Sequence, residues 1–234
     1  MVTIVMPAYN EAEIIEASVR AWYTEVIGKL PGSELVVVDD CSTDGTGEIL
    51  KKMSGELPML RVLRTPSNGG HGAAVSFGLR RAKQDFVFQT DSDGQYPPEE
   101  FWNLWNERER SDFVFGERTS RADGLFRMAV STCLRVINLM VWGIWVRDAN
   151  CPFKLMRKEA LEKVMKHIPA DSFIPMVFVS MLARKMRMRV LAVPVTHLPR
   201  RGGSQSLQGM LRWYRVGKQC VGEIMRIRKS WQTR

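Results

Sequence analysis

The chain has 234 residues, of which 45% are hydrophobic and 25% charged, and it carries a net charge of +9 at neutral pH. This is an ordinary globular composition without repeats or low-complexity tracts, and its four widely spaced cysteines favour reduced, cytoplasmic thiols over a disulfide framework. No signal peptide is expected, because residues 2–6 lack a basic flank and run directly into Pro7.

The first hundred residues alternate strand-like and helix-like segments. Short apolar runs at residues 2–6, 35–38, 60–63 and 86–88 predict strands. Asn10 and Glu13 predict a capping box at the start of one helix, and a second helix is expected to begin near Ser42–Asp44. This alternation predicts an α/β protein with a mostly parallel sheet covered by helices on both faces.

Polar side chains follow three of these strands. Tyr9, Asn10 and Glu11 follow the first, Asp39 and Asp40 end the second, and Asp91 and Asp93 follow the fourth. Because ligands bind beyond the carboxyl ends of strands in such sheets, we expect these loops to meet at one site.

The segment Asp91-Ser-Asp-Gly-Gln95, followed by two prolines, predicts a cation site. Carboxylate and amide oxygens with open coordination positions suit Mg²⁺ or Mn²⁺, and such a metal can neutralise a departing diphosphate. A strand-end Asx turn is the structural alternative for Asp91 and Asp93, and a helix cap is the alternative for Asp39 and Asp40.

The glycine-rich segment from Asn68 to Ala74 contains Gly70-x-Gly72, but Val75 stands where a dinucleotide fingerprint has its third small residue. We expect these glycines to let the backbone pass close to a bound nucleotide, and a simple turn is the alternative.

The second half of the chain is more varied. Strands are predicted at residues 113–115, 153–156 and 190–195, and helices at 158–167 and at 170–182 with a break at Pro175. Residues 125–146 predict a largely apolar helix that is either core or an interfacial or acceptor-binding element, because its two arginines argue against a transmembrane span. Asp148, directly after it, is either an acceptor-site group or a structural cap.

The positive charge is concentrated at the C-terminal end. From Arg184 to Arg234 there are 13 Lys or Arg residues against one acid, whereas the rest of the chain carries 21 basic and 24 acidic side chains. A basic loop over residues 200–206 and a basic amphipathic helix over 207–229 predict an anionic partner. Nucleic acid, anionic lipid headgroups and substrate phosphates are the three alternatives.

In chain order, these motifs resemble the family 2 glycosyltransferases with a GT-A fold. The resemblance rests on Ile4–Glu11, Val37–Thr46, Asn68-x-Gly-x-Gly-x-Ala74 and Asp91-x-Asp-x-Gln95. Within that family the chain is most similar to the dolichol-phosphate mannose synthase and polyprenyl-phosphate glycosyltransferase group, through Gly116-x-Arg118, Asp148–Leu155 and Pro194–Ser206.

This resemblance implies an inverting transfer of a sugar from a GDP- or UDP-linked donor to a polyprenyl phosphate, with Mn²⁺ or Mg²⁺ as cofactor. The donor-binding residues would be Pro7, Tyr9, Glu11, Asp39, Asp40, Asn68, Gly72, Asp91 and Ser92, and the metal ligands Asp91, Asp93 and Gln95. Catalytic roles would fall to Asp93, Asp148, Arg118 and Arg200. Phosphate or acceptor contacts would come from Arg118, Arg127, Lys154, Arg200, Arg201 and Ser204.

The expected organisation is a GT-A domain over residues 1–206 and a basic helix over 207–234 that rests on the cytoplasmic face of a membrane, without nucleic acid as a partner. Two departures from the family matter. A Ser-Lys pair commonly follows the loop glycine, whereas here Gly203 precedes Ser204-Gln205-Ser206, and many relatives carry C-terminal transmembrane helices that are not expected here, so a separate membrane subunit remains open.

Two alternatives stay open at this point. A hydroxyl acceptor on a soluble glycan or glycolipid would require a general base, with Asp148 as the candidate. A protein of a different class, a non-catalytic module or complex subunit, would use the basic tail for binding.

Overall fold

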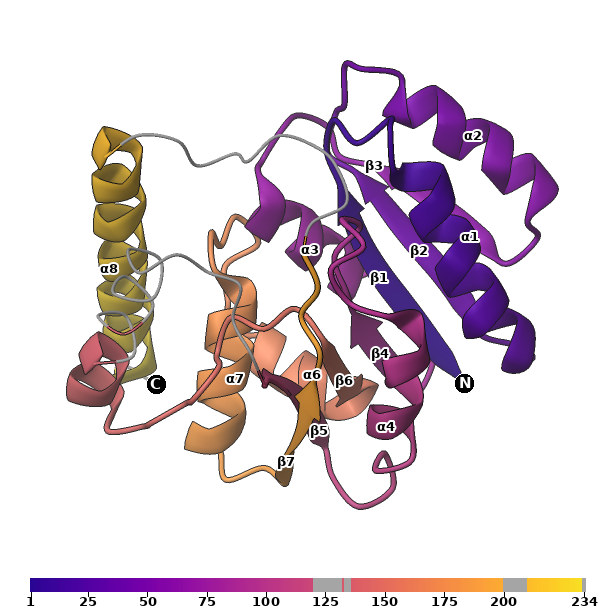
Figure 1. The fold of residues 1–234 in the computed structure, drawn as a ribbon. Coiled ribbons are helices and arrows are strands. Elements are labelled where there is room, and N and C mark those ends of the chain that lie inside the picture. Colours follow the sequence, from indigo (N-terminus) through magenta and orange to yellow (C-terminus); the bar gives the residue numbers. More distant parts are fainter. Residues whose placement is uncertain (120–131, 133–135, 200–209, 233–234) are drawn as a thin grey trace.

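Seven strands form one twisted sheet in the computed structural model, which describes residues 1–119, 132, 136–199 and 210–232 (Figure 1). The strands are β1 (Val2–Ala8), β2 (Glu34–Asp39), β3 (Leu60–Arg64), β4 (Phe86–Gln89), β5 (Phe113–Arg118), β6 (Lys154–Arg157) and β7 (Val190–Val195). Their order is β3-β2-β1-β4-β6-β5-β7, and only the two pairs that involve β6 are antiparallel. The mostly parallel sheet predicted from the alternating segments is therefore confirmed.

Helices cover both faces of the sheet (Figure 1). One face packs against α1 (Ile15–Glu25), α2 (Thr46–Glu56) and α4 (Phe101–Trp105). The other packs against α3 (His71–Leu79), α6 (Lys158–Met165) and α7 (Pro175–Lys185). The chain then forms α8 (Met210–Gln232), whose Ile224 and Ile227 are buried in this second core.

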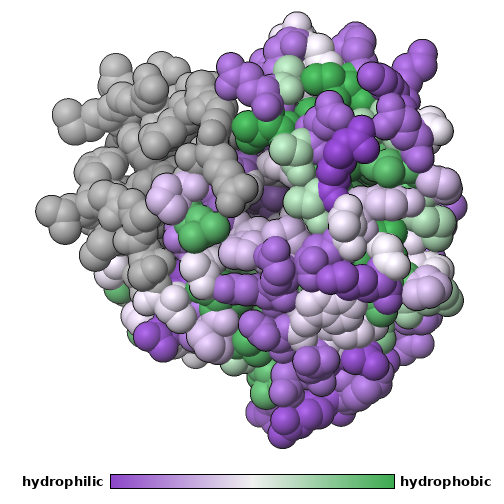
Figure 2. Space-filling view, turned by 45° about the vertical axis from the view of Figure 1, so that its right-hand side comes forward, coloured by the Kyte–Doolittle hydropathy of each residue, from purple (hydrophilic) through white to green (hydrophobic). Residues whose placement is uncertain are grey.

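Strict alternation along the central strands produces these two cores. In β1, Ile4 and Met6 face the first core, whereas Val5 between them faces the second. Successive side chains of a strand point to opposite faces, so a strand covered on both sides is apolar at most of its positions. On the surface shown in Figure 2, hydrophobic residues lie in separate small groups among hydrophilic ones.

Helix starts differ from those predicted. The expected capping box of Asn10 and Glu13 is wrong, because α1 begins only at Ile15. Asn10 has a φ of +53°, and its Oδ1 accepts a hydrogen bond from the Thr43 backbone N–H at 2.9 Å. The second helix starts at Thr46, after Gly45 with a φ of +97°, and α7 begins at Pro175 rather than breaking there.

The segment predicted as a helix over residues 125–146 is described only at 132 and from 136 onward, where a helix ends at Trp142 and is followed by Gly143 with a φ of +68°. Asn138 and Trp142 are buried, whereas Val136, Leu139 and Met140 are exposed. The described part therefore has both a core face and an apolar face toward solvent.

Candidate functional site

The carboxyl ends of β1, β2 and β4 meet at one edge of the sheet, because β1 pairs in parallel with both other strands. The loops that follow β1 and β2 interlock: the backbone N–H of Asn10 donates to Ser42 Oγ at 3.0 Å, and that of Glu11 donates to Thr46 Oγ1 at 2.9 Å. The predicted convergence of polar strand ends is thus present in the fold.

Glu11 and Ser92 connect the loop after β1 to the loop after β4. The Ser92 hydroxyl lies within hydrogen-bond distance of the Glu11 carboxylate and 2.9 Å from the Pro7 carbonyl oxygen. Ser18 Oγ donates to the Ser92 carbonyl at 2.6 Å. Pro7, Glu11 and Ser92 are buried in this contact, whereas Tyr9 is 46% exposed at the rim.

Adjacent carboxylates after β2 have different partners. Asp40 accepts hydrogen bonds from Thr65 Oγ1 (2.7 Å) and from the backbone N–H groups of Gly69 (3.2 Å) and Gly70 (2.7 Å). Asp39 accepts one from the backbone N–H of Ser42 (2.9 Å). Asp40 therefore holds the glycine segment in place, a role that sequence reasoning missed because its partners lie 25 to 30 residues away.

Gly72 makes close contact with the protein's own backbone. A Cβ at this position would lie 2.3 Å from the Phe173 carbonyl oxygen and 2.4 Å from that of Ser172. Packing of α3 against residues 172–173 therefore requires a glycine here, and the predicted approach of Gly72 to a nucleotide stays a prediction. Gly70, at the helix start, needs its missing side chain for a different reason, since its φ is +82°.

Gly72→Ala is expected to destabilise the protein by about 1–3 kcal/mol, because the added methyl group forces α3 away from residues 172–173. Urea unfolding monitored by tryptophan fluorescence measures this loss. Gly55→Ala, where an added Cβ meets nothing within 4 Å, is the control and should not lower stability. Equal stabilities of the two variants would contradict the packing role.

Asp91, Asp93 and Gln95 lie together after β4, as predicted. Asp93 is only 8% exposed and accepts a hydrogen bond from the Gln95 backbone N–H at 3.1 Å. Asp91 Oδ1 lies 3.2 Å from Gln89 Nε2 and 3.6 Å from His71 Nε2. Gln95 Nε2 donates to the Leu198 carbonyl at 3.1 Å, which ties this loop to the segment after β7.

This donor set fits a hard divalent cation. Among the described residues no three or more His, Cys, Asp or Glu side chains are grouped to enclose a metal on their own. Two carboxylates and an amide oxygen instead match Mg²⁺ or Mn²⁺, which bind few protein ligands and complete their coordination with water and phosphate oxygens.

Arg118 and Asp148 form a buried, two-pronged ion pair. Arg118 Nε and Nη2 lie 2.8 and 2.7 Å from the two carboxylate oxygens, and the Arg118 backbone N–H donates to the same group at 3.3 Å. The side chains are 12% and 4% exposed. Burial lowers the pKa of Arg118, but the hydrogen bonds to Asp148 and the charge interactions with Asp148, Tyr96 and Cys151 together outweigh it, so the pKa is raised and the guanidinium stays charged. The sequence placed both residues in the site but did not indicate that they pair.

Lys154 requires a correction. Its side chain is fully buried, and its ammonium donates to the carbonyl oxygens of Ala149 (2.7 Å), Cys151 (2.6 Å) and Met176 (3.5 Å). The predicted contact of Lys154 with a phosphate is therefore not made by this buried group. Burial lowers the pKa of Lys154 to about 8, with a smaller lowering by Arg118 and an opposing effect of Asp148.

This lowered pKa predicts a pH dependence of stability. Between pH 8 and 10.5 the unfolded chain binds a proton at Lys154 that the folded chain does not, so folding is favoured increasingly as pH rises through that window. The free energy of unfolding of the wild-type protein is expected to rise relative to that of Lys154→Met from pH 8 to 10. Denaturant titrations at several pH values measure the difference, and a constant difference would contradict the shift.

Four predicted site residues, Arg127, Arg200, Arg201 and Ser204, lie outside the described residues. Asn68 is exposed beside the glycine segment, where its Oδ1 lies 3.2 Å from the Gly70 backbone nitrogen. Tyr96 was missed by sequence reasoning. It is buried below the Asp91–Gln95 loop, next to Cys151, and burial strongly raises the pKa of its phenol.

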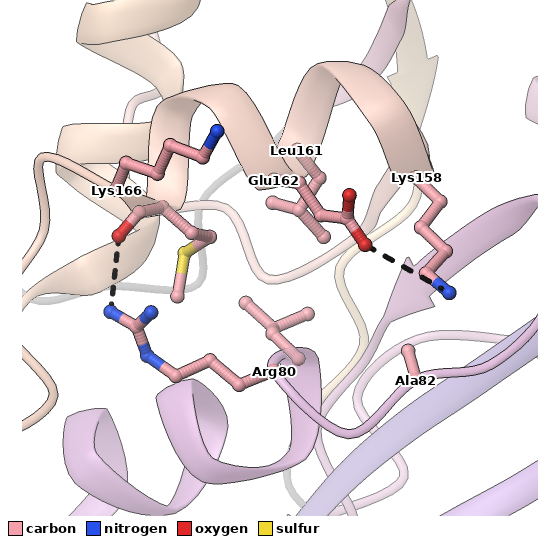
Figure 3. A pocket seen from close by; sticks show the side chains of 8 residues that line it. Arg80, Ala82, Lys158, Leu161, Glu162 and Lys166 are labelled. Atoms are coloured by element: carbon pink, nitrogen blue, oxygen red, sulfur yellow. Dashed lines mark hydrogen bonds and ion pairs between the residues drawn. The ribbon is translucent and has the colours of Figure 1, made fainter.

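A pocket of about 300 Å³ lies away from these loops, between the end of α3 and α6 (Figure 3). Arg80 lines this pocket and donates to the carbonyl oxygens of Met165 (3.1 Å) and Ile168 (2.6 Å). Met165 is the last residue of α6, and Ile168 follows it. Lys158 lies 3.8 Å from Glu162. Cations near a helix C-terminus hydrogen-bond to the free carbonyl oxygens there. Arg80 therefore has a structural role at the end of α6, and the pocket needs no ligand to explain it.

Comparisons with known proteins agree with this architecture. The family described as glycosyl transferase family 2 matches residues 3–165. Undecaprenyl-phosphate 4-deoxy-4-formamido-L-arabinose transferases of Salmonella paratyphi B and Salmonella typhimurium are 28% identical over 214 residues, which cover 89% of this chain and 63% of theirs. The chain thus spans less than two thirds of the length of these curated relatives.

Solved structures show the same fold. A mannosyltransferase from Pyrobaculum calidifontis, in complex with GDP-Man and Mn²⁺, is 25% identical with a TM-score of 0.61, over 86% of this chain and 58% of its own. Glucosyl-3-phosphoglycerate synthase from Mycobacterium tuberculosis, in complex with Mn²⁺, UDP-Glc and phosphoglyceric acid, is 20% identical with a TM-score of 0.69, over 98% and 80%. The second likeness concerns the GT-A fold alone.

Proposed function

The chain belongs to glycosyl transferase family 2, and from this premise we propose that it moves a sugar from a nucleotide diphosphate sugar to a polyprenyl phosphate. The observation that carries the proposal is the placement of Asp91 and Asp93 at the carboxyl end of β4, among the loops after β1 and β2. Curated relatives named as undecaprenyl-phosphate sugar transferases support the choice of acceptor.

On the donor side, Tyr9, Glu11 and Asp39 would hold the nucleoside. Asp91, Asp93 and the Gln95 side-chain oxygen would hold Mn²⁺ or Mg²⁺, as the Mn²⁺ complexes of neighbouring structures support. The metal would supply neutralisation of the departing diphosphate. Asp40 would act indirectly, by holding the glycine segment at the rim of this site.

On the acceptor side, the engagement of Asp148 favours a phosphate over a hydroxyl. A hydroxyl acceptor needs a general base, but the Asp148 carboxylate is buried and bound to Arg118 through both oxygens. A phosphate monoester has a second pKa near about 6, so at neutral pH it is mostly a dianion and needs little deprotonation. Arg118 can bind such oxygens with its planar guanidinium, and Asp148 would orient it.

A matched pair of acceptors tests this assignment. Purified protein, Mn²⁺ and labelled GDP- and UDP-sugars are incubated with polyprenyl phosphate or with the unphosphorylated polyprenol of the same chain length. Label is expected in the organic phase only with the phosphate, and the active donor identifies the base and the sugar. Transfer to polyprenol at an equal rate would contradict the phosphate acceptor and favour the hydroxyl alternative.

The cytoplasmic face of a membrane is the proposed location. No helix within the described ranges combines the length and the apolarity that a transmembrane span requires. An apolar group of exposed side chains, Val136, Leu139, Met140 and Trp145, instead lies on and just beyond the helix that ends at Trp142. Exposed groups of this kind fit insertion into a membrane interface, with the basic C-terminal segment near anionic headgroups.

The double variant Leu139→Glu/Met140→Glu is expected to lose at least about tenfold of its binding to vesicles that contain anionic lipid, because two carboxylates replace inserted apolar groups. Vesicle co-sedimentation measures this. Met59→Glu, a change of an exposed methionine beside β3, is the control and should bind like wild type. Failure of the wild-type protein to bind vesicles would contradict direct docking and favour anchoring by a separate membrane subunit.

A further inference from the structure

Lys154 is a buried cation whose ammonium does more than fill space in the core. It opens β6 in the interior of the sheet and is fully buried, and its ammonium donates only to main-chain carbonyls among the contacts described above. Taking an ammonium out of water is costly, and an apolar side chain of similar volume would fill the same space more cheaply. A charge in this place therefore points to a role beyond packing.

The carbonyls that Lys154 holds belong to one turn. Ala149 and Cys151 follow Asp148 in the sequence. The Cys151 backbone N–H donates to the Asp148 carbonyl at 3.4 Å, which closes the turn. Ser180 Oγ, from α7, lies 3.1 Å from the same Ala149 oxygen. The Lys154 ammonium thus holds the turn that carries Asp148, and the Ser180 hydroxyl, which is shared with the Met176 carbonyl oxygen at 2.9 Å, lies against the same turn.

Asp148 in turn fixes Arg118, the last residue of β5, through two short hydrogen bonds to its guanidinium. A guanidinium group that is bound through two of its nitrogens has little freedom to rotate. Contacts thus run from the Lys154 ammonium through the main chain of residues 149–151 to Asp148, and from the Asp148 carboxylate to Arg118. The Arg118 guanidinium keeps its positive charge in this arrangement, which favours an anionic group beside it.

We propose that Lys154 is a positioning residue for phosphate recognition: through the Ala149 and Cys151 carbonyls it holds the Asp148 turn, and through Asp148 it sets the place of the Arg118 guanidinium. The proposal rests on the proposed function, in which Arg118 meets the phosphate of the acceptor. It also accounts for a lysine that touches no substrate and is nevertheless kept in the core.

A double-mutant cycle with Lys154→Met and Arg118→Lys tests this chain. Lys154→Met is expected to lower kcat by on the order of 10²-fold, the cost of misplacing a catalytic group by about 1 Å, with the donor Kd within about twofold of wild type. The double variant should be no slower than Arg118→Lys alone, because both changes act through the same guanidinium. Effects that multiply would overturn the proposal. Lys154→Arg, which keeps the charge and the donors, should restore most of the activity.

Arg80→Met is the matched control. Arg80 also holds two main-chain carbonyls, but at the opposite end of α3 from the glycine segment (Figure 3). Its loss should reduce stability and leave kcat unchanged. If Lys154→Met does not fold, Ser180→Ala replaces it in the cycle, because it removes a hydroxyl that lies 3.1 Å from the Ala149 and 2.9 Å from the Met176 carbonyl oxygen and leaves Lys154 in place. A Ser180→Ala kcat equal to that of wild type would then overturn the proposal.

Amide hydrogen exchange tests the positioning role of Lys154 without requiring that the protein transfers a sugar. Exchange at Arg118 and at residues 148–151 is expected to be at least about tenfold faster in Lys154→Met than in wild type, and unchanged in Arg80→Met. Unchanged exchange in Lys154→Met would overturn the positioning role whether or not transfer is detected. Faster exchange in a protein that transfers no sugar to any acceptor would instead contradict the proposed function alone.

Discussion

Asp93→Ala is expected to abolish sugar transfer, with kcat lowered by on the order of 10³-fold or more. The reason is twofold. The variant loses one of two carboxylates that would bind the metal, and it also frees the Gln95 backbone N–H that Asp93 holds at 3.1 Å. Release of nucleoside diphosphate as a function of Mn²⁺ concentration measures the effect, and added metal should restore little of the rate.

Asp171→Asn provides the control for this change, because Asp171 is a 77% exposed carboxylate 3.8 Å from Arg226. It should transfer sugar at the wild-type rate. An Asp93→Ala variant that retains activity, or wild-type activity that persists in EDTA, would count against a metal-dependent donor site and favour the non-catalytic alternative.

Asp148→Asn has the second largest expected effect, on both stability and rate. Removing one charge of a buried ion pair leaves Arg118 uncompensated, which costs about 3–5 kcal/mol of stability. The guanidinium loses its fixed orientation, so kcat should fall by roughly 10²-fold. Denaturant unfolding and initial-rate kinetics with polyprenyl phosphate provide the two measurements.

The pH profile of the residual activity distinguishes the two roles of Asp148. If it orients Arg118, the profile of Asp148→Asn should keep the shape of the wild-type profile at a lower level, since no proton transfer is lost. If Asp148 is a general base, turnover should be abolished while donor binding is kept, and the loss of stability should be the same in both cases. The second outcome would favour a hydroxyl acceptor.

The sheet and the location of the site could be predicted from the sequence because both depend on local patterns. Each central strand is a short apolar run, and the polar residues that follow β1, β2 and β4 necessarily meet once these strands pair in parallel. Residues 91–95 were predicted for the same reason, since they follow β4 directly. The family resemblance that rested on these motifs is confirmed by the match over residues 3–165.

Roles that depend on distant partners could not be predicted. Gly72 is required by carbonyl oxygens a hundred residues away, and Lys154 is buried partly against a carbonyl of α7. The pairing of Arg118 with Asp148 spans 30 residues. Asn10 was misinterpreted as a helix cap because its side chain bonds to the loop after β2, a contact that no local pattern indicates.

The most direct test of the account is the stoichiometry of one reaction. Protein, the active nucleotide sugar, Mn²⁺ and polyprenyl phosphate are incubated, and glycosylated lipid phosphate and released nucleoside diphosphate are both quantified by mass spectrometry. Equal amounts of the two products are expected with wild-type protein, and neither product with Asp93→Ala or in EDTA. Nucleoside diphosphate released without any glycosylated lipid, or no product with any donor, would contradict transfer to the lipid phosphate.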